Sequence, residues 1–140
     1  MILLDTNVLS ELMRPQPEQK VLQWIDTQAP SRLRISSLTV AEISLGIARL
    51  PDGKRKENFT RLAQALFEED FAGKILPFDT AAAHHYAQIV AQREKAGRPI
   101  SMADAQIAAI CQNIPGPAAL ATRNVKDFAG LDIALINPWE

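Results

Sequence analysis

Four acidic side chains of this sequence have the chemistry needed for metal-dependent work on phosphate esters: Asp5, Glu42, Asp104 and Asp127. Oxygen-rich sites suit Mg²⁺ or Mn²⁺, hard ions that keep water in their coordination shell. A bound ion of this kind lowers the pKa of a water molecule and stabilises charge that develops on a phosphoryl oxygen. Without metal, clustered acids repel one another and also repel a phosphodiester. The chemistry therefore depends on whether the fold brings these residues together.

Asp5 follows the short apolar run Ile2–Leu4, which is typical of a strand. A carboxylate in this position often caps the helix that comes next, so position alone does not distinguish a cap from a metal ligand. Asp79 follows Ile75–Phe78 in the same way, and there a helix cap is the preferred interpretation. If Asp5 is a ligand, the Thr6–Asn7 pair is placed to orient it and to order water.

Glu42 and Asp104 each end a capping-box pattern, Thr39–Glu42 and Ser101–Asp104. In this pattern the first residue accepts from a free backbone N–H, and the acid reaches back to another. The pattern predicts that both acids lie in the first turn of a helix, where the helix dipole favours the ionised form. That favours a cap and a metal ligand equally.

The neighbours of these two acids favour a ligand. Asp104 shares a helical stripe with Ala108 and Cys111, which is a small and apolar surface. An ionised carboxylate that faces inward is costly unless a partner is present, and this stripe offers no cation. Glu42 shares its stripe with Gly46, a residue that costs roughly 1 kcal/mol in mid-helix and leaves open space. A divalent ion shared by several acids would resolve the cost.

The stretch Ala121–Phe128 follows another strand-like run and contains the fourth acid. Asn124 and Asp127 lie three residues apart, so they share a face if the segment is helical. Arg123 and Lys126 add positive charge suited to a phosphate. The alternative interpretation is a polar turn and a solvated short helix.

The elements that position these residues alternate between strands and helices. Helical periodicity appears around residues 40–50, 59–67, 83–90 and 103–114; Gly97 is expected to cap the third of these helices, and Pro115–Pro117 to stop the fourth. Such alternation predicts an α/β fold with a mainly parallel sheet, in which sites form at the carboxyl ends of the strands. Strand-like runs occur at Ile2–Leu4, Leu33–Ser36, Ile75–Phe78, Ala118–Ala121 and Ile133–Ile136.

Composition limits the class of protein. The 140 residues are 47% hydrophobic and 22% charged with a net charge of −1, as in an ordinary globular domain without an overall basic field. Cys111, the only cysteine, is expected to be a core residue, and it permits neither an internal disulfide nor a cysteine zinc site. Trp24 and Trp139 are expected to be packing or interface residues. With no membrane segment and no signal peptide evident, we expect a cytoplasmic protein that consists of one domain, residues 1–140.

The acidic motifs together resemble those of the PIN domain. LLDTN, the isolated Glu of TVAE, ADAQIAA and ATRNVKDF match the family's motifs in order and at similar spacing. The pattern is most similar to VapC-type toxins of type II toxin–antitoxin systems, and within them to the FitB-like branch. MILLDTNVLSE, RPQP, FAGKILPFD and the closing NPW resemble that branch, so the resemblance spans essentially the whole chain.

The resemblance implies a PIN-like fold, with a central parallel sheet flanked by helices on both faces. It implies a Mg²⁺- or Mn²⁺-dependent ribonuclease that is held inactive by a cognate antitoxin, dimerises, and meets operator DNA only through the antitoxin. Asp5 and Asp104 become the principal metal ligands, with Glu42 beside them; either Asp127 supplies the fourth carboxylate or Asn124 takes that place more weakly, and one or two ions fit. The resemblance also assigns residues that orient the acids or contact substrate: Thr6, Asn7, Thr122, Arg123 and Asn124.

Two other functions are compatible with part of the pattern. A PIN-like scaffold could bind RNA or a protein without cutting, although it would have no need for costly inward carboxylates. A haloacid-dehalogenase-type phosphatase also begins with a strand that ends in an acid, but it requires a second Asp where this chain has Asn7. Metal-dependent RNA cleavage distinguishes a nuclease from the scaffold.

Overall fold

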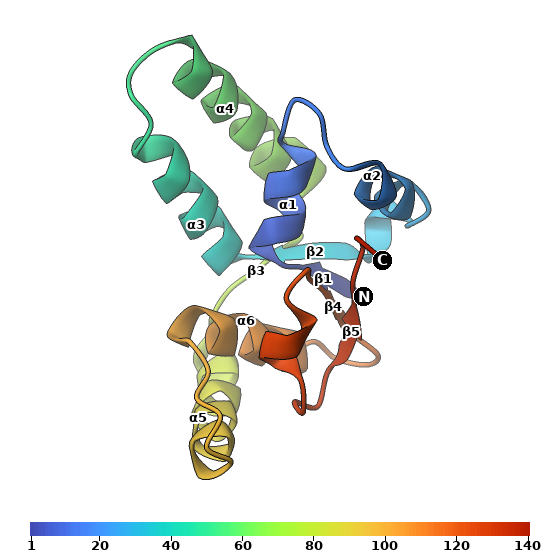
Figure 1. The fold of residues 1–140 in the computed structure, drawn as a ribbon, viewed down its shortest axis with the longest axis vertical. Coiled ribbons are helices and arrows are strands. Elements are labelled where there is room, and N and C mark those ends of the chain that lie inside the picture. Colours follow the sequence, from blue (N-terminus) through green and yellow to red (C-terminus); the bar gives the residue numbers. More distant parts are fainter.

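The computed structural model describes residues 1–140 and contains one five-stranded sheet in which all paired strands are parallel (Figure 1). The strand order is β3-β2-β1-β4-β5, so the chain builds one half of the sheet, returns, and builds the other half beyond β1. In open parallel sheets ligands bind where the order reverses, here between β1 and β4. The strands are β1 (Ile2–Leu4), β2 (Leu33–Ser36), β3 (Ile75–Leu76), β4 (Ala119–Ala121) and β5 (Ala134–Ile136).

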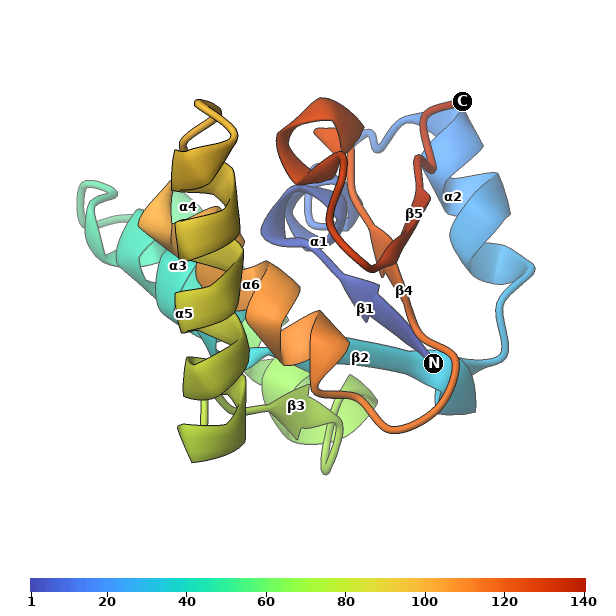
Figure 2. The same cartoon turned by 90° about the horizontal axis from the view of Figure 1, so that it is seen from below.

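Helices cover both faces of the sheet, as predicted (Figure 2). Successive side chains of a strand point to opposite faces, so β1 contributes to two cores. Leu3 packs in a cluster with residues of α5 and α6, whereas Ile2 and Leu4 pack in a second cluster with residues of α1 to α4. The helices are α1 (Thr6–Leu12), α2 (Gln19–Asp26), α3 (Ser37–Ala48), α4 (Lys54–Ala65), α5 (Thr80–Lys95) and α6 (Met102–Gln112).

Three helices begin at side-chain caps that the sequence indicates. Asp5, Asp79 and Ser101 accept backbone N–H groups at the starts of α1, α5 and α6. Gly97 lies just after α5 with a φ of 68°, as expected for a C-terminal glycine. The caps fix where each helix starts, and so they also fix which residues face the carboxyl edge of the sheet.

The capping box predicted at Thr39–Glu42 is wrong. Helix α3 already begins at Ser37, and its cap is Ser36, whose side chain accepts from the backbone N–H of Thr39. Thr39 is therefore inside the first turn and fully buried. Ser36, the last residue of β2, offers the same cap chemistry as Thr39, and it comes earlier in the chain.

Other differences concern element ends. The strand predicted at residues 75–78 stops at Leu76, since Pro77 has no N–H to donate, and β4 and β5 each begin one residue later than predicted. Helix α2 was not identified, because its eight residues give a short pattern. A short 3₁₀ helix, Pro30–Arg32, comes directly before β2. None of the helices has the length and apolarity that crossing a membrane requires.

Candidate active site

Asp5 lies at the carboxyl end of β1, next to the point where the strand order reverses. The residue is only 5% exposed, yet each carboxylate oxygen has a close hydrogen-bond donor. Oδ1 accepts from the backbone N–H of Thr6 at 2.8 Å, and Oδ2 accepts from the hydroxyl of Thr122 at 2.8 Å. The helix cap and the buried carboxylate are thus the same group, so the two interpretations of Asp5 do not exclude each other.

Burial raises the pKa of Asp5 above its ordinary value of 3.8. The hydrogen bonds from Thr122 and Thr6 oppose this rise, while the charges of Asp104 and Glu42 add to it. The fold therefore holds a carboxylate where ionisation is unfavourable and other negative charges are close. That is the electrostatic condition under which a bound cation is stabilised.

Thr122 joins the ends of β1 and β4. It is fully buried, and its hydroxyl also accepts from Asn124 N at 3.1 Å and from Asn7 Nδ2 at 3.4 Å. Asn7 in turn accepts from the backbone N–H of Arg123 at 3.3 Å. The two bonds made by Asn7 link residues more than a hundred positions apart in the sequence, and together these bonds fix the segment after β4 beside Asp5.

Glu42 reaches the site from α3. Its Oε1 accepts from the hydroxyl of Thr6 at 3.0 Å, and Thr6 also lies 2.9 Å from the hydroxyl of buried Thr39. The Glu42 side chain is exposed, and a Cβ added at Gly46 meets no atom within 4 Å. The space predicted beside Glu42 is present, and Thr6 holds the carboxylate in it.

Asp104 lies in the first turn of α6, where its backbone N–H donates to the Ser101 cap at 3.2 Å. Burial raises its pKa above 3.8, and the charge of Asp127 adds to the rise, while Ser101 and Arg93 oppose it. Behind it, Ala108 and Cys111 are buried in the α5–α6 core, as the apolar stripe predicted.

Asp127 lies in a short 3₁₀ helix, Val125–Phe128, and is exposed. Buried Arg93 of α5 holds this segment by donating to the backbone carbonyls of Asp127 and Ala129. The Asp127 side chain does not line the pocket described below, whereas Asn124 does. Asp127 is close enough for its charge to act on Asp104, so both candidates for the fourth position stay near the site.

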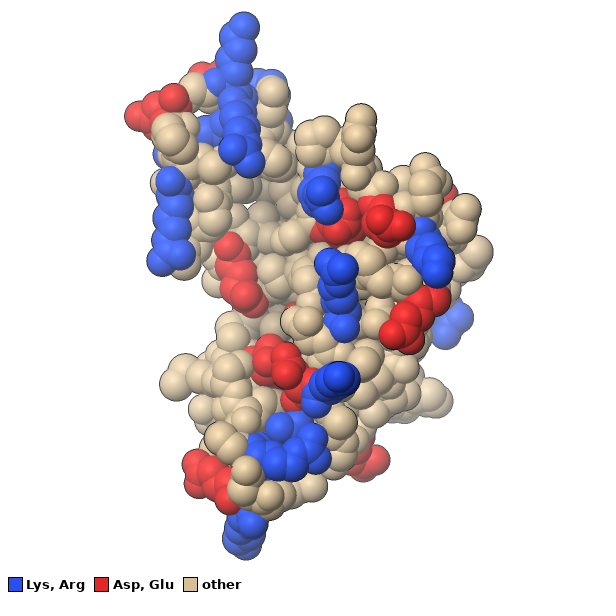
Figure 3. Space-filling model, in the orientation of Figure 1, with Lys and Arg blue, Asp and Glu red and all other residues tan.

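A polar pocket of about 460 Å³ brings most of the predicted residues together. Three of the four acids contribute, while Asp127 does not and Thr122 lies buried behind Asp5. Figure 3 shows this face, on which basic side chains run down the middle with acidic side chains to either side. The predicted residues that line the pocket are Asp5, Thr6, Asn7, Glu42, Asp104, Arg123 and Asn124.

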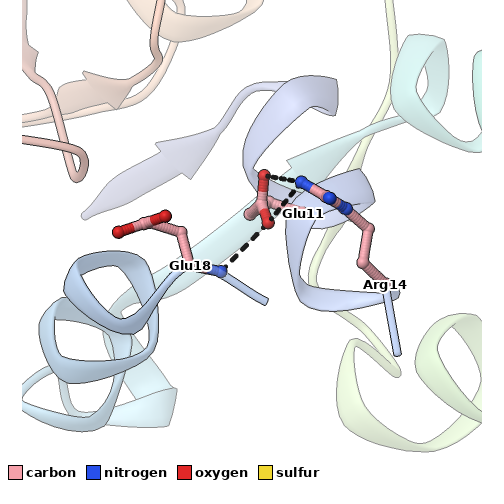
Figure 4. A network of polar contacts seen from close by, with 3 residues as sticks. All are labelled: Glu11, Arg14 and Glu18. Atoms are coloured by element: carbon pink, nitrogen blue, oxygen red, sulfur yellow. Dashed lines mark hydrogen bonds and ion pairs between the residues drawn. The ribbon is translucent and has the colours of Figure 1, made fainter. Parts of the chain in front are cut away.

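Five other residues that line this pocket were not predicted from the sequence: Ser10, Glu11, Arg14, Ile107 and Trp139. Glu11 is 6% exposed and accepts from Arg14 at 3.1 Å and from the backbone N–H of Glu18 at 3.0 Å (Figure 4). The three-residue spacing of Glu11, near the end of α1, and Arg14, just after it, is the signal that could have found the pair. For Trp139, the sequence held no signal beyond its place in the closing NPW.

The donor set fits a hard divalent ion. No group of three or more His, Cys, Asp or Glu side chains is arranged to hold one ion by itself. Mg²⁺ does not need such a cage, since it usually keeps several waters and binds one or two carboxylates together with substrate phosphates. Asp5 and Asp104 offer two carboxylates whose pKa values are raised, and the charge of Asp104 repels that of Asp5. Their donor atoms are oxygens, which hard ions such as Mg²⁺ prefer.

Asn in place of Asp104 is expected to stabilise the metal-free protein. Because the folded state raises the pKa of this carboxyl above 3.8, folded stability falls as the pH rises through that range and the group ionises. The uncharged Asn avoids this loss. Because the side chain is partly exposed and solvent screens its charge, we expect the free energy of unfolding at pH 7 to rise by less than about 1 kcal/mol.

Urea denaturation in EDTA checks the expectation, and the gain should shrink as the pH falls toward 4. The control variant is Asp132→Asn, which changes an exposed acid outside the pocket. A variant of Asp104 that is less stable than the parent at pH 7 would contradict the electrostatic account.

Comparison with known proteins identifies the family. A sequence model of the PIN domain matches residues 2–129, which is most of the chain. This chain belongs to the PIN domain family. The VapC ribonuclease Y4jK of Sinorhizobium fredii is 41% identical over 100% of this chain and 99% of the relative. Toxin FitB of Neisseria gonorrhoeae is 44% identical over 99% of both chains.

Solved structures are similar to this PIN domain over its whole length. The structure of FitAB bound to an IR36 DNA fragment is 41% identical, covers 100% of this chain and 96% of the solved chain, and has a TM-score of 0.89. A toxin–antitoxin complex from Klebsiella pneumoniae is 25% identical, covers 100% and 99%, and has a TM-score of 0.70. The predicted family and its FitB-like branch are confirmed.

Proposed function

We propose that residues 1–140 act as one PIN domain that hydrolyses RNA as a cytoplasmic toxin. The observation that carries this proposal is the pocket at the strand-order reversal, where buried Asp5 is held beside Asp104 and Glu42. Relatives that match the whole chain at 41% and 44% identity are named as a VapC ribonuclease and as a toxin. A domain that only bound RNA would gain nothing from a buried carboxylate next to two further acids.

Mg²⁺ or Mn²⁺ is the proposed cofactor. Asp5 and Asp104 would hold it, with Glu42 and either Asp127 or Asn124 completing the site. When bound, such an ion supplies an activated water and stabilises charge on the phosphoryl and leaving oxygens.

The chain's own residues prepare this site before any ion binds. Thr122 and the backbone of Thr6 fix both oxygens of Asp5, so the carboxylate does not have to reorganise. The hydroxyl of Thr6 donates to the Glu42 carboxylate and holds it in the pocket. Asn7 bridges Thr122 and the segment after β4, which keeps Asn124 beside the acids.

A cognate antitoxin is the proposed partner. The similar solved structures include a toxin–antitoxin complex and FitAB bound to DNA. We propose that this chain is likewise neutralised by an antitoxin, and that the pair contacts operator DNA through the antitoxin, because this chain has no overall basic field. The homodimer implied by the family resemblance stays a prediction that light scattering of the purified chain would test.

The proposal is tested by incubating purified, antitoxin-free protein with total cellular RNA. We expect cleavage in Mg²⁺ or Mn²⁺ and none in EDTA, with activity restored when the metal is added back. The sample in EDTA is checked by circular dichroism, so that loss of folding is not mistaken for loss of metal.

Cleavage that survives EDTA would contradict a metal-dependent nuclease. Folded protein that binds Mn²⁺ and RNA but cuts no RNA under any condition would favour the scaffold instead.

A further inference from the structure

The pocket that holds the acids also contains two arginines, Arg14 and Arg123, and Arg14 already forms an ion pair. Both contacts of Arg14 go to the carboxylate of Glu11, at 3.1 and 3.2 Å, and Glu11 is itself fixed by the backbone N–H of Glu18 (Figure 4). Arg14 thus pairs with a buried acid, and that acid joins α1 to the segment before α2 by accepting from Glu18. The positive charge of Arg14 is therefore offset by the carboxylate of Glu11.

Arg123 is different, because its guanidinium has no hydrogen-bond or ion-pair partner in the chain. It lies over the ring of Trp139, with the guanidinium carbon 5.1 Å from the ring centroid. A guanidinium that faces an aromatic ring keeps its N–H groups free at its edge, which is the geometry that binds phosphate. Arg123 is therefore the arginine of this pocket whose charge is not paired with an acid.

Both members of this pair are fixed from the backbone. The N–H of Arg123 donates to Asn7, and the preceding residue, Thr122, donates to Asp5. The N–H of Trp139 donates to the side chain of Asn137 at 3.0 Å, and Pro138 between them is buried. The backbone that carries the Trp139 ring is thus fixed at the end of the segment after β5. The Arg123 backbone is one residue from a side chain that touches Asp5.

We propose that Arg123 binds a backbone phosphate next to the one that is cleaved, and that Trp139 is a positioning residue that holds the guanidinium. This inference rests on the proposed function, since it assigns part of the RNA to part of the same pocket. RNA carries a phosphate at every nucleotide, so a strand placed with one phosphate at the acids brings its neighbours to the rim. The guanidinium of Arg123 attracts a phosphate, whereas the nearby carboxylates repel it. This contrast favours one path of the RNA backbone across the pocket.

The test uses RNA binding by the cleavage-deficient Asp104→Asn protein in Mg²⁺, with a labelled single-stranded oligonucleotide of mixed sequence. Kd is measured over a range of NaCl concentrations. Each phosphate contact contributes about 0.7 to the slope of log Kd against log salt for single strands. Arg123→Gln in this background is expected to weaken binding roughly 5- to 10-fold at low salt and to reduce the slope by about 0.7.

Trp139→Leu separates positioning from stacking on a base. If Trp139 acts through Arg123, this variant reduces both affinity and slope, the double variant is no worse than Arg123→Gln, and Trp139→Phe restores most of the binding. If affinity falls while the slope is unchanged, the ring stacks on a base and the positioning role is overturned. The control is Arg32→Gln, an exposed arginine before the amino end of β2, which should leave both quantities unchanged.

An unchanged slope in folded Arg123→Gln, with binding otherwise intact, overturns this inference and leaves the ribonuclease proposal standing. Absence of RNA binding by the background protein, together with absence of cleavage by the parent, overturns the ribonuclease proposal and this inference with it.

Discussion

Asn in place of Asp5 is expected to lower the rate of RNA cleavage on the order of 10³-fold, the loss of about 4 kcal/mol of transition-state stabilisation. Asn is nearly isosteric and is itself a good helix cap, so α1 should still begin at Thr6 and the fold should survive. What is lost is the charge on a buried group that both Thr122 and Thr6 orient. Single-turnover cleavage in Mg²⁺ measures the effect, and Asp104→Asn is expected to behave in the same way.

The matched control is Asp26→Asn, which removes an exposed acid at the end of α2 and lies outside the pocket. Its cleavage rate should stay within about twofold of the parent rate, because exposed charges away from the site contribute little. Mn²⁺ binding provides a second readout, and it should weaken in the Asp5 and Asp104 variants but not in the control. An Asp5→Asn protein that is folded and still cuts at the parent rate would show that the acids are structural only.

The sequence predicted the placement of the principal acids because that placement follows from local rules. Residues after parallel strands meet at one edge of a sheet, so Asp5 and the segment after Ala121 were expected at the same edge once the strands were recognised. That the two are neighbours follows from the pairing of β1 with β4. Asp104 was predictable because Ser101 caps its helix and the stripe behind it is apolar. These inferences needed only spacing, side-chain chemistry and the cost of burying a charge.

The remaining features depend on contacts between distant segments. Glu42 was placed near the start of its helix from Thr39, but Ser36 is the cap, and Thr39 instead contacts Thr6 from a neighbouring helix. No local pattern could have placed Trp139 under Arg123, because the two segments come together only through the pairing of β4 and β5.

The choice between Asn124 and Asp127 also depends on tertiary structure. Arg93 on α5 is distant in the sequence, yet it contacts the turn that carries Asp127 and fixes it. That turn leaves Asn124 in the pocket wall and the Asp127 side chain outside it. The three-residue spacing of the two side chains could not distinguish these positions, because it depends on how the short helix is held against α5.

Thr122 provides the sharpest test of how the site is held together, because one hydroxyl serves three residues. It donates to Asp5 Oδ2 at 2.8 Å and accepts from Asn124 N and Asn7 Nδ2, which uses its single proton and both lone pairs. Thr122→Val keeps the shape and removes all three bonds. We expect metal affinity to fall about 10- to 100-fold, as for other residues that orient a metal ligand.

The pH dependence of this variant gives the loss a distinct signature. The bond from Thr122 lowers the pKa of Asp5, which burial has raised, so its removal makes the carboxyl still harder to ionise. Protons then compete with the metal up to a higher pH, and the pH at half-maximal Mn²⁺ binding should move upward. Thr122→Ser keeps the hydroxyl and is expected to bind metal with the affinity and pH midpoint of the parent. A Val variant with weaker binding but an unchanged midpoint would mean that Thr122 acts by packing, and that the charge state of Asp5 is set by burial and the neighbouring acids alone.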